Sequence, residues 1–536
     1  MLHIKARSGV RAILIQGINR GVSMFSTAEL GQKVSKSEYN QREPLLRQEL
    51  LDVQRQLREE GSFPVIIVFA GVDGGGKGDT VNLLNEWMDP RWLLTKAYDK
   101  PSDEESERPE YWRYWRELPP KGRIGLFLSS WYSQPILDRV YRKDNVAVLD
   151  DRLDRIMAFE KALADDDALI LKFWMHLSRD AQKRRLKKLE KDPLTSWRVT
   201  DRDWEHWRIY DRFEETAERT IMRTSTGTAP WTIVEGLDSH FRSLTVGTIV
   251  RDEINRHLDE VRKKRLLREE LQVRQADEER AGDTRDAGDE STVIAPLKTA
   301  TVLSALDMSK SLNKAEYKKL LRQWQAELNQ LHRKALKKKL SSILLFEGPD
   351  AAGKGGAIRR MTAALDARHY RVIPVAAPTD EERAQHYLWR FWRHLSRAGR
   401  ITIFDRSWYG RVLVERVEKF ATKDEWKRAY AEINEFEEQL TEHGVIVLKY
   451  WVHITKDEQL DRFKAREETP HKRWKLTEED WRNREKWEDY ELAVNDIVEH
   501  TSTRHAPWIL VEGNDKRFSR IKVLQAYCAR LQSALK

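Results

Sequence analysis

GPDAAGKGG at residues 348–356 is the stretch that decides the fold. It follows the apolar run ILLF at residues 343–346 and precedes AIRRM at residues 357–361. An apolar strand, a glycine-rich turn and a helix start are the parts of a phosphate-binding P-loop. Glycines let several backbone N–H groups point at one phosphate, and the helix N-terminus and a lysine add positive charge. The residues predicted to bind phosphate here are Gly348, Gly353, Lys354, Gly355 and Gly356.

The usual Mg²⁺ ligand of a P-loop is missing. A Ser or Thr normally follows the lysine, and here that position is Gly355. A magnesium ion must therefore find its protein oxygens elsewhere. Asp350, inside the loop, is one candidate.

A second copy of the loop, GVDGGGKGD at residues 71–79, follows the apolar run VIIVF at residues 65–69. The offset of 277 residues between Gly71 and Gly348 also aligns tryptophans far from the loops. The aligned pairs include Trp112 with Trp389, Trp131 with Trp408, Trp174 with Trp451, Trp204 with Trp481, and Trp231 with Trp508. The chain is therefore a tandem duplication.

The duplication divides the chain into predicted parts. We expect an N-terminal domain over 24–261, a charged linker over 262–312 and a C-terminal catalytic domain over 313–536. Residues 1–23 carry four basic residues and no acidic one, which is compatible with a targeting segment, a disordered extension or an upstream start.

Short β-branched runs alternate with amphipathic stretches in each domain. In the second copy, strands are predicted at 371–375, 401–404, 445–448 and 508–511, with helices at 383–396 and 424–441. This alternation predicts an α/β fold in which each domain is a parallel sheet flanked by helices.

A second chemical element, DRSWYGR at residues 405–411, follows the strand predicted at 401–404. An aspartate at the end of a central strand is where P-loop enzymes hold Mg²⁺, and a nearby arginine can neutralise a phosphoryl group in transfer. The predicted catalytic residues are thus Asp350, Lys354, Asp405 and Arg406, with Asp350 and Asp405 as metal ligands.

The first copy has lost this element. Leu128 and Ser129 stand where the second copy has Asp405 and Arg406. Leucine can neither bind a cation nor screen phosphate charge, so we expect the N-terminal domain to be inactive. It retains a degenerate loop site at Asp73 and Lys77.

Basic residues beyond the strand at 445–448 predict a lid that closes over a polyanion, although a solvated surface would have the same composition. The lid candidates are Arg462, Lys464, Arg466, Lys472, Arg473 and Lys475. The candidates for an acceptor site are Arg393, Arg400, Arg411 and Glu415. The aromatic stretches at 111–116 and 390–393 could stack on a base, but such spacing more often serves packing.

Composition sets outer limits on the function. The 536 residues have a formal net charge of +9, which suits a polyanion such as nucleic acid, a membrane surface or a chain of phosphates. Cys528 is the only cysteine, so an intramolecular disulfide and a cysteine-rich metal site are excluded, and a reducing, cytoplasmic compartment is compatible. No apolar run is long enough to span a membrane.

With the Gly-x-Asp-x-x-Gly-Lys-Gly loop, the Asp-Arg-Ser-Trp-Tyr segment and the basic lid together, the chain resembles the polyphosphate kinase type 2 family from about residue 24 onward. The two-domain arrangement resembles its polyphosphate:AMP phosphotransferases. The resemblance implies a kinase fold with a helical lid, transfer from inorganic polyphosphate to AMP to give ADP, and Mg²⁺ as cofactor. It places the family's phosphate loop on Asp350, Gly353, Lys354 and Gly355, and its second motif on Asp405 and Arg406.

Other functions are left open by the residues alone. A polyphosphate-driven nucleoside diphosphate kinase or an ATP-dependent nucleoside monophosphate kinase would share the loop, the metal and the lid. A nucleic-acid-binding protein would share the positive charge, but it leaves Asp350 and Asp405 unexplained. We therefore expect polyphosphate and AMP as partners, with no nucleic acid or membrane; a homo-oligomer stays open.

Overall fold

The computed structural model describes residues 23–282, 301–469 and 476–536. Its contacts divide the chain into two units, each built on one sheet. Among the described residues, the first consists of residues 23–100, 117–282 and 384–386, and the second of residues 101–116, 301–383, 387–469 and 476–536. The predicted extension lies outside the described residues except for Ser23, which donates hydrogen bonds to Glu214 and Glu218.

The first unit contains a five-stranded sheet in the order β2-β3-β1-β4-β5. All of its recorded strand pairs are parallel. The strands are β1 (Val65–Gly71), β2 (Leu93–Ala97), β3 (Ile124–Leu128), β4 (Leu169–His176) and β5 (Trp231–Glu235). The longer helices are α2 (Lys36–Glu60), α3 (Lys77–Trp87), α6 (Ser133–Val140), α7 (Val146–Asp165), α8 (Arg179–Lys191), α9 (Asp201–Arg208), α10 (Tyr210–Thr224) and α11 (Ser239–Gly282).

The second unit repeats this topology in the order β10-β9-β6-β8-β7, again with parallel pairs. Its strands are β6 (Ser342–Glu347), β7 (Tyr370–Pro374), β8 (Ile401–Asp405), β9 (Ile446–His453) and β10 (Trp508–Glu512). Its longer helices are α12 (Lys314–Lys337), α13 (Lys354–Thr362), α17 (Lys423–Glu442), α18 (Lys456–Glu467), α19 (Glu478–Glu485), α20 (Trp487–Thr501) and α21 (Lys516–Leu535).

The other helices of the described residues are short. They are η1 (Met24–Ala28), η2 (Pro90–Trp92), α4 (Asp103–Ser106), α5 (Trp112–Arg116), η3 (Ser196–Arg198), η4 (Ala367–His369), α14 (Asp380–Arg383), α15 (Trp389–Trp392), η5 (Trp408–Val412) and α16 (Val414–Val417).

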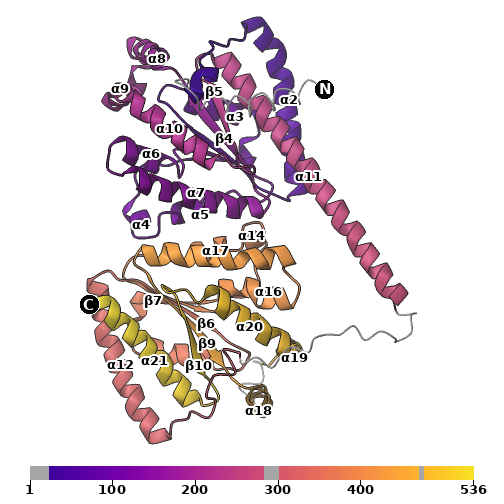
Figure 1. Ribbon diagram of the computed structural model, residues 1–536, viewed down its shortest axis with the longest axis vertical. Coiled ribbons are helices and arrows are strands. Elements are labelled where there is room, and N and C mark those ends of the chain that lie inside the picture. Colours follow the sequence, from indigo (N-terminus) through magenta and orange to yellow (C-terminus); the bar gives the residue numbers. More distant parts are fainter. Residues whose placement is uncertain (1–22, 283–300, 470–475) are drawn as a thin grey trace. The chain divides into compact units, whose positions relative to one another are not determined.

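Helices cover both faces of each sheet (Figure 1). In the second unit, α12, α13 and α21 pack on one face, and α16, α17 and α20 lie over the other. Leu344 and Phe346 of β6 face the core beneath α12, α13 and α21. Because successive side chains of a strand alternate between faces, Leu345 and Glu347 point toward the opposite layer. This alternation places Glu347 beside the site described below.

The predicted strands and the α/β fold are confirmed, and α17 matches the helix predicted at 424–441. The single helix predicted at 383–396 is wrong, because the segment contains only the last residue of α14 and the short helix α15. Trp389, Phe391 and Trp392 are all buried on the short helix α15. The burial of these rings confirms packing as their role.

The predicted linker at 262–312 is ordered at both ends. The helix α11 runs on to Gly282, and residues 283–300 lie outside the described residues. Leu303 is buried, and Lys310 Nζ lies 3.0 Å from Glu512 Oε1 in the second unit. Residues 301–312 therefore belong structurally to that unit.

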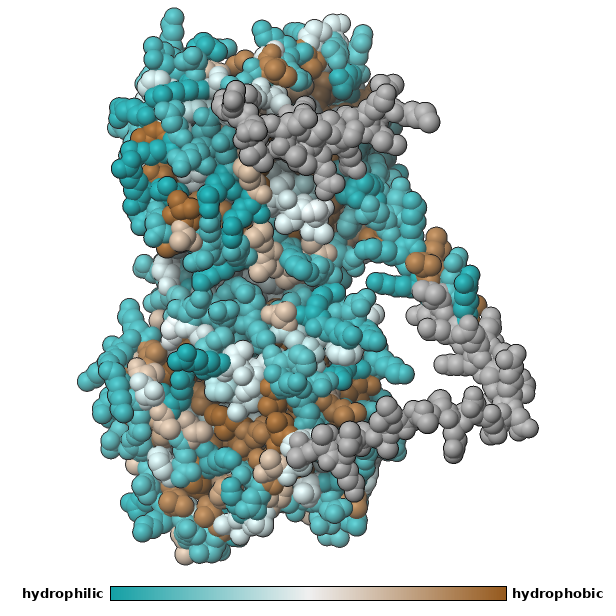
Figure 2. All heavy atoms as spheres, viewed as in Figure 1, coloured by the Kyte–Doolittle hydropathy of each residue, from teal (hydrophilic) through white to brown (hydrophobic). Residues whose placement is uncertain are grey.

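The surface fits the charged composition. On the face shown in Figure 2, hydrophilic residues cover most of each unit. Among the described helices, none combines the length and apolar character that crossing a bilayer requires.

Candidate active site

The glycine-rich loop joins the end of β6 to the start of α13. Gly348 and Gly353 have φ values of 144° and 110°, in the region that favours glycine. A Cβ atom at Gly348 would lie 2.4 Å from the carbonyl oxygen of Val452, so no larger residue fits there. A Cβ at Gly355 would meet nothing within 4 Å, so space lies open at the N-terminus of α13. Open amides at a helix N-terminus favour an anion.

Lys354, the first residue of α13, folds over this loop. Its Nζ donates hydrogen bonds to the carbonyl oxygens of Gly348, at 2.5 Å, and Pro349, at 3.3 Å. Lys77 of the first unit makes the equivalent bonds to Gly71, at 2.6 Å, and Val72, at 3.2 Å. The loop therefore fixes a positive charge at its own rim.

Arg406 follows the end of β8, which pairs with β6 so that Asp405 lies opposite Phe346. Its backbone has φ 66° and donates a hydrogen bond to the carbonyl oxygen of Phe346 at 3.1 Å. A positive φ is strained for a residue with a long side chain, and such residues cluster at functional sites. The turn directs the guanidinium to Asp350, whose Oδ1 lies 3.1 Å from Arg406 Nη2.

Asp350 is held from two sides, because Asn483 of α19 donates a hydrogen bond to its Oδ2 at 2.9 Å. Burial alone would raise the pKa of Asp350, but the charges of Lys354 and Arg406 and the bond from Asn483 outweigh it. The pKa of Asp350 is therefore lower than usual. Asp350 stays ionised and orients Arg406.

These groups open into a polar cavity of about 470 Å³. Its lining residues that carry charge are Asp350, Lys354, Arg359, Asp405, Arg406, Arg466, Glu479 and Asp480. Sequence reasoning missed Arg359, Glu479 and Asp480. A second, smaller cavity of about 90 Å³ shares Asp350 and Arg406 with the first. Its walls are mostly apolar and include Leu413, Val414, Trp451, Trp487 and Val494.

The described residues contain no group of three His, Cys, Asp or Glu side chains placed to hold a metal ion. Mg²⁺ commonly takes only one or two carboxylates, with waters and substrate phosphates completing its shell. Asp405 fits this requirement, since its carboxylate lines the polar cavity and bonds to no described side chain. Asp350 fits less well, because Arg406 and Asn483 already occupy its two oxygens.

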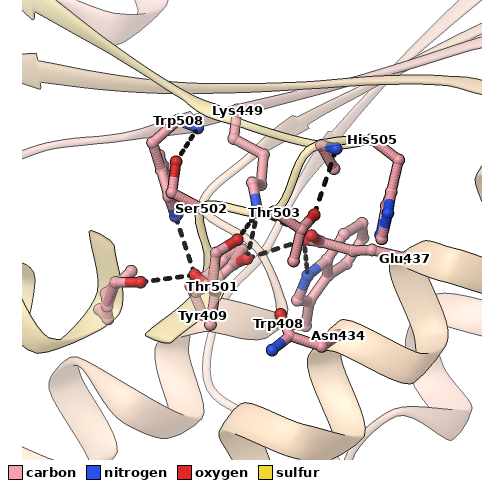
Figure 3. Close-up of polar contacts among 12 residues, drawn as sticks. Trp408, Tyr409, Asn434, Glu437, Lys449, Thr501, Ser502, Thr503, His505 and Trp508 are labelled. Atoms are coloured by element: carbon pink, nitrogen blue, oxygen red, sulfur yellow. Dashed lines mark hydrogen bonds and ion pairs between the residues drawn. The ribbon is translucent and has the colours of Figure 1, made fainter. Parts of the chain in front are cut away.

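Trp408 and Tyr409, which follow Arg406 closely in the chain, belong to a buried network (Figure 3). Lys449 Nζ donates to Tyr409 Oη at 2.9 Å, to Glu437 Oε2 at 2.7 Å and to the carbonyl oxygen of Thr501 at 2.6 Å. Trp408 Nε1 donates to Glu437 Oε1 at 3.0 Å. The first unit repeats this network with Trp131, Tyr132, Glu160, Lys172 and Thr224. It therefore belongs to what the two units share.

The corresponding loop of the first unit lines a cavity of about 320 Å³, but it carries an acidic side chain at its helix N-terminus. Asp79, which stands where the second unit has Gly356, lies in the first turn of α3. Its carboxylate is 2.6 Å from Arg198 Nη2, 3.4 Å from Arg185 Nη2 and 4.0 Å from Arg242 Nη2. A carboxylate so placed occupies the position where a helix N-terminus favours an anion.

The polyphosphate kinase 2 family model matches residues 33–263 and 311–536. The chain belongs to this family. It is 50% identical over 513 residues to a polyphosphate:AMP phosphotransferase of Pseudomonas aeruginosa, covering 96% of this chain and 99% of the relative. It is 47% identical over 515 residues to the enzyme of the same name from Pseudomonas syringae pv. tomato, covering 95% and 99%.

A solved structure of the family agrees with both units. The crystal structure from Pseudomonas aeruginosa PA01, described as a polyphosphate kinase 2, matches with a TM-score of 0.83 and 46% identity. The match covers 95% of this chain and 99% of that one. The fold is therefore that of the polyphosphate kinase 2 family, and the two-unit arrangement is shared with this structure.

Arg462, predicted to bind phosphate in this family member, is instead a buried brace. Its guanidinium donates to the carbonyl oxygens of Ala351 and Ala352 in the loop and to those of Gly513 and Asn514. An arginine whose guanidinium already donates hydrogen bonds to four backbone carbonyl oxygens is not available to bind substrate. The prediction for Arg462 is wrong because α18 turns this residue inward beneath the loop.

The remaining lid candidates divide by position. Arg466 lines the polar cavity, whereas Lys464 is exposed and does not line it. Lys472, Arg473 and Lys475 lie outside the described residues. The lid stays a prediction.

The four residues predicted for an acceptor site do not come together in either cavity. Arg400 precedes β8, at the end of the sheet opposite the loop, since its carbonyl oxygen accepts from the first residue of β6. Arg393 pairs with Glu381 at 3.1 Å, and Arg411 pairs with Glu415 at 3.2 Å. The second cavity is the better acceptor candidate.

Asn483 was missed because 133 residues separate it from Asp350. The two units share this kind of contact, since the aligned residue of the first unit, His206, also contacts the loop aspartate. His206 Nδ1 lies 2.6 Å from Asp73 Oδ2.

Proposed function

We propose that this member of the polyphosphate kinase 2 family transfers a phosphoryl group from inorganic polyphosphate to AMP and forms ADP. The proposal is supported by the relatives of the same name that match nearly the whole chain. The observation that carries it is the polar cavity in which Lys354, Arg406 and Arg466 surround the glycine-rich loop. Three cations around a helix N-terminus suit a chain of phosphates.

The site residues of the second unit have separate roles in this transfer. The loop amides and Lys354 bind the terminal phosphates of the donor. Arg406, held by Asp350 through one nitrogen, keeps the others to neutralise charge on the transferring group. Phosphoryl transfer needs aligned partners and compensated charge more than covalent help, and these residues contribute to both.

The proposal includes Mg²⁺ as cofactor, with Asp405 as its protein ligand. Bound there, Mg²⁺ would neutralise part of the charge on the phosphate oxygens. Asp405 supplies a hard oxygen ligand at the strand end that faces the polar cavity. Asp350 then serves chiefly to orient Arg406.

The acceptor's nucleoside is assigned to the second cavity. Trp451, Trp487 and Val494 give it apolar walls, and Asp350 and Arg406 form its border with the polar cavity. Donor and acceptor would then approach Arg406 from two sides, as in-line transfer requires. A cytoplasmic location is also proposed, in keeping with Cys528, which is free and buried.

A screen of donors and acceptors tests the proposal. Purified protein is supplied with polyphosphate or ATP as donor and with AMP, ADP or GMP as acceptor, and products are separated by ion-exchange chromatography. We expect the highest kcat/KM for polyphosphate with AMP. A preference for ATP would indicate a nucleoside monophosphate kinase, and a preference for ADP a diphosphate kinase. Competition by nucleic acid at equal phosphate concentration would favour a nucleic-acid-binding protein.

A further inference from the structure

Both units make the same turn after the equivalent strand. Ser129 follows β3 with φ 50°, and Arg406 follows β8 with φ 66°. Neither residue is glycine, so each turn must be stabilised by its surroundings. The two units use one common anchor and differ in a second.

The common anchor is the buried network around Glu437 and Lys449, which holds the Trp408 and Tyr409 end of the turn (Figure 3). The first unit keeps it although Asp405 and Arg406 are replaced there. This anchor therefore serves the fold rather than the chemistry.

The second anchor exists only in the unit that has Asp405 and Arg406. Ser407 Oγ donates a hydrogen bond to Glu347 Oε1 at 2.7 Å. Glu347 is the last residue of β6, is 3% exposed and directly precedes the glycine-rich loop. One buried bond thus joins the base of the loop to the residue that follows Arg406.

The first unit has lost this anchor. Ala70 stands in place of Glu347, and the hydroxyl of Ser130, the counterpart of Ser407, is buried without a hydrogen-bond partner among the described residues. The turn nevertheless forms, as Ser129 shows. Glu347 is therefore not needed to fold it.

The buried carboxyl group of Glu347 lowers the stability of the second unit, and folding of the turn does not explain why it is present. Burial raises the pKa of its carboxyl, against the bond from Ser407 and the charges of Lys354 and Arg406. A buried carboxylate is destabilising unless it is paired and hydrogen-bonded. The unit that retains it is the one with the candidate catalytic residues.

We propose that Glu347 is a positioning residue, which acts through Ser407 to fix the direction in which Arg406 leaves its turn. The proposal rests on the function assigned to Arg406 above. Fixing that direction matters because a misplacement of about 1 Å in a reacting group can lower the rate on the order of 10²-fold.

Four variants test it: Glu347→Ala, Glu347→Gln, Ser407→Ala and, as matched control in the first unit, Ser130→Ala. Glu347→Ala should lower kcat by about 10- to 100-fold, with KM for polyphosphate and AMP changed less than about twofold and no loss of Tm. Glu347→Gln keeps an oxygen that accepts from Ser407, so its kcat should return to within about threefold of the parent. Ser130→Ala should leave kcat unchanged.

Coupling to Arg406 separates positioning from a general effect. In an Arg406→Ala background, Glu347→Ala should cause no further loss, since nothing remains to be positioned. Ser407→Ala should lower kcat as much as Glu347→Ala does, and the double variant Glu347→Ala, Ser407→Ala should be no slower than either single variant. If Glu347→Ala fails to fold, Ser407→Ala tests the proposal in its place.

Several outcomes would overturn the inference. These are a Glu347→Gln variant as slow as Glu347→Ala, a rise confined to KM for AMP, or losses that add to that of Arg406→Ala. A parent protein that forms no ADP from polyphosphate would instead defeat the proposed function.

Discussion

Arg406 and Asp350 form an ion pair across the mouth of the glycine-rich loop, with 3.1 Å between Nη2 and Oδ1. Asp350 is only 16% exposed in its side chain, whereas Arg406 is 45% exposed. The acid is therefore a fixed support, and the arginine reaches from it into the cavity.

Replacement of Arg406 by alanine should lower kcat on the order of 10³-fold or more, the usual effect of an arginine that stabilises phosphoryl transfer. Arg406→Lys should recover only part of this loss, since lysine lacks the planar fork that grips two phosphate oxygens. Rates are measured at saturating AMP, polyphosphate and Mg²⁺. Arg400→Ala is the control, because Arg400 lies at the far end of β8 and its loss should change kcat less than about threefold. A drop below tenfold for Arg406→Ala would show that another group carries this role.

Asp405→Asn keeps the size of the side chain but removes the charge assigned to Mg²⁺. We expect a large loss of rate at millimolar Mg²⁺ and partial recovery as Mg²⁺ is raised, because a weaker site needs more metal. Asp424→Asn, an exposed acid in the first turn of α17, serves as control. A loss that no metal concentration reduces would place Asp405 outside the metal site.

Asp79→Gly gives the first unit the residue that the second has at Gly356. Removing the carboxylate frees Arg185, Arg198 and Arg242, so the loop should gain affinity for phosphates. Binding of polyphosphate is measured by calorimetry in a Lys354→Ala background, which weakens the second site. Glu59→Gln, an exposed site on α2 with the same change of charge, should leave binding unchanged. Equal binding in the Asp79 and Glu59 variants would mean that Asp79 does not keep phosphates from the N-terminus of α3.

His453 should make the second unit less stable in mild acid. Burial lowers the pKa of this histidine from 6.5 to about 4. As the pH falls, the unfolded state therefore binds a proton at this histidine before the folded state does. The contribution of His453 to the unfolding free energy is fully present above about pH 6.5 and is lost as the pH falls from 6.5 to 4. The slope is at most about 1.4 kcal/mol per pH unit.

Denaturant unfolding of the His453→Gln variant at several pH values checks this contribution. The variant should flatten the pH dependence in that window, whereas His500→Gln, at an exposed position, should not. Identical slopes in the parent and both variants would show that His453 does not titrate as its burial implies.

The sequence predicted the parts of the site that lie close together along the chain. The loop at 348–356 and the pair Asp405 and Arg406 each follow an apolar strand, and parallel strands bring such ends to one edge of a sheet. The duplication exposed the loss of the pair in the first unit. Contacts made across the fold could not be predicted in the same way.

Arg462 and Asn483 show what the sequence could not reveal. Both come from helices after β9, and the way each helix turns on its axis decides whether a side chain reaches the cavity or the backbone beneath it. Composition marked Arg462 as a phosphate ligand, but its helix buries it among carbonyl oxygens. Asn483 has no charge and so gave no signal in the basic segment.

The most direct test of the account is ADP formation from AMP with polyphosphate as the sole donor, compared between Lys354→Ala and Lys77→Ala. The two lysines make equivalent bonds in their loops, so any difference reports the unit and not the substitution. The account predicts that Lys354→Ala lowers turnover at least on the order of 10²-fold, while Lys77→Ala retains most of it. Comparable losses in both variants, or a greater loss in Lys77→Ala, would contradict the claim that the second unit performs the transfer.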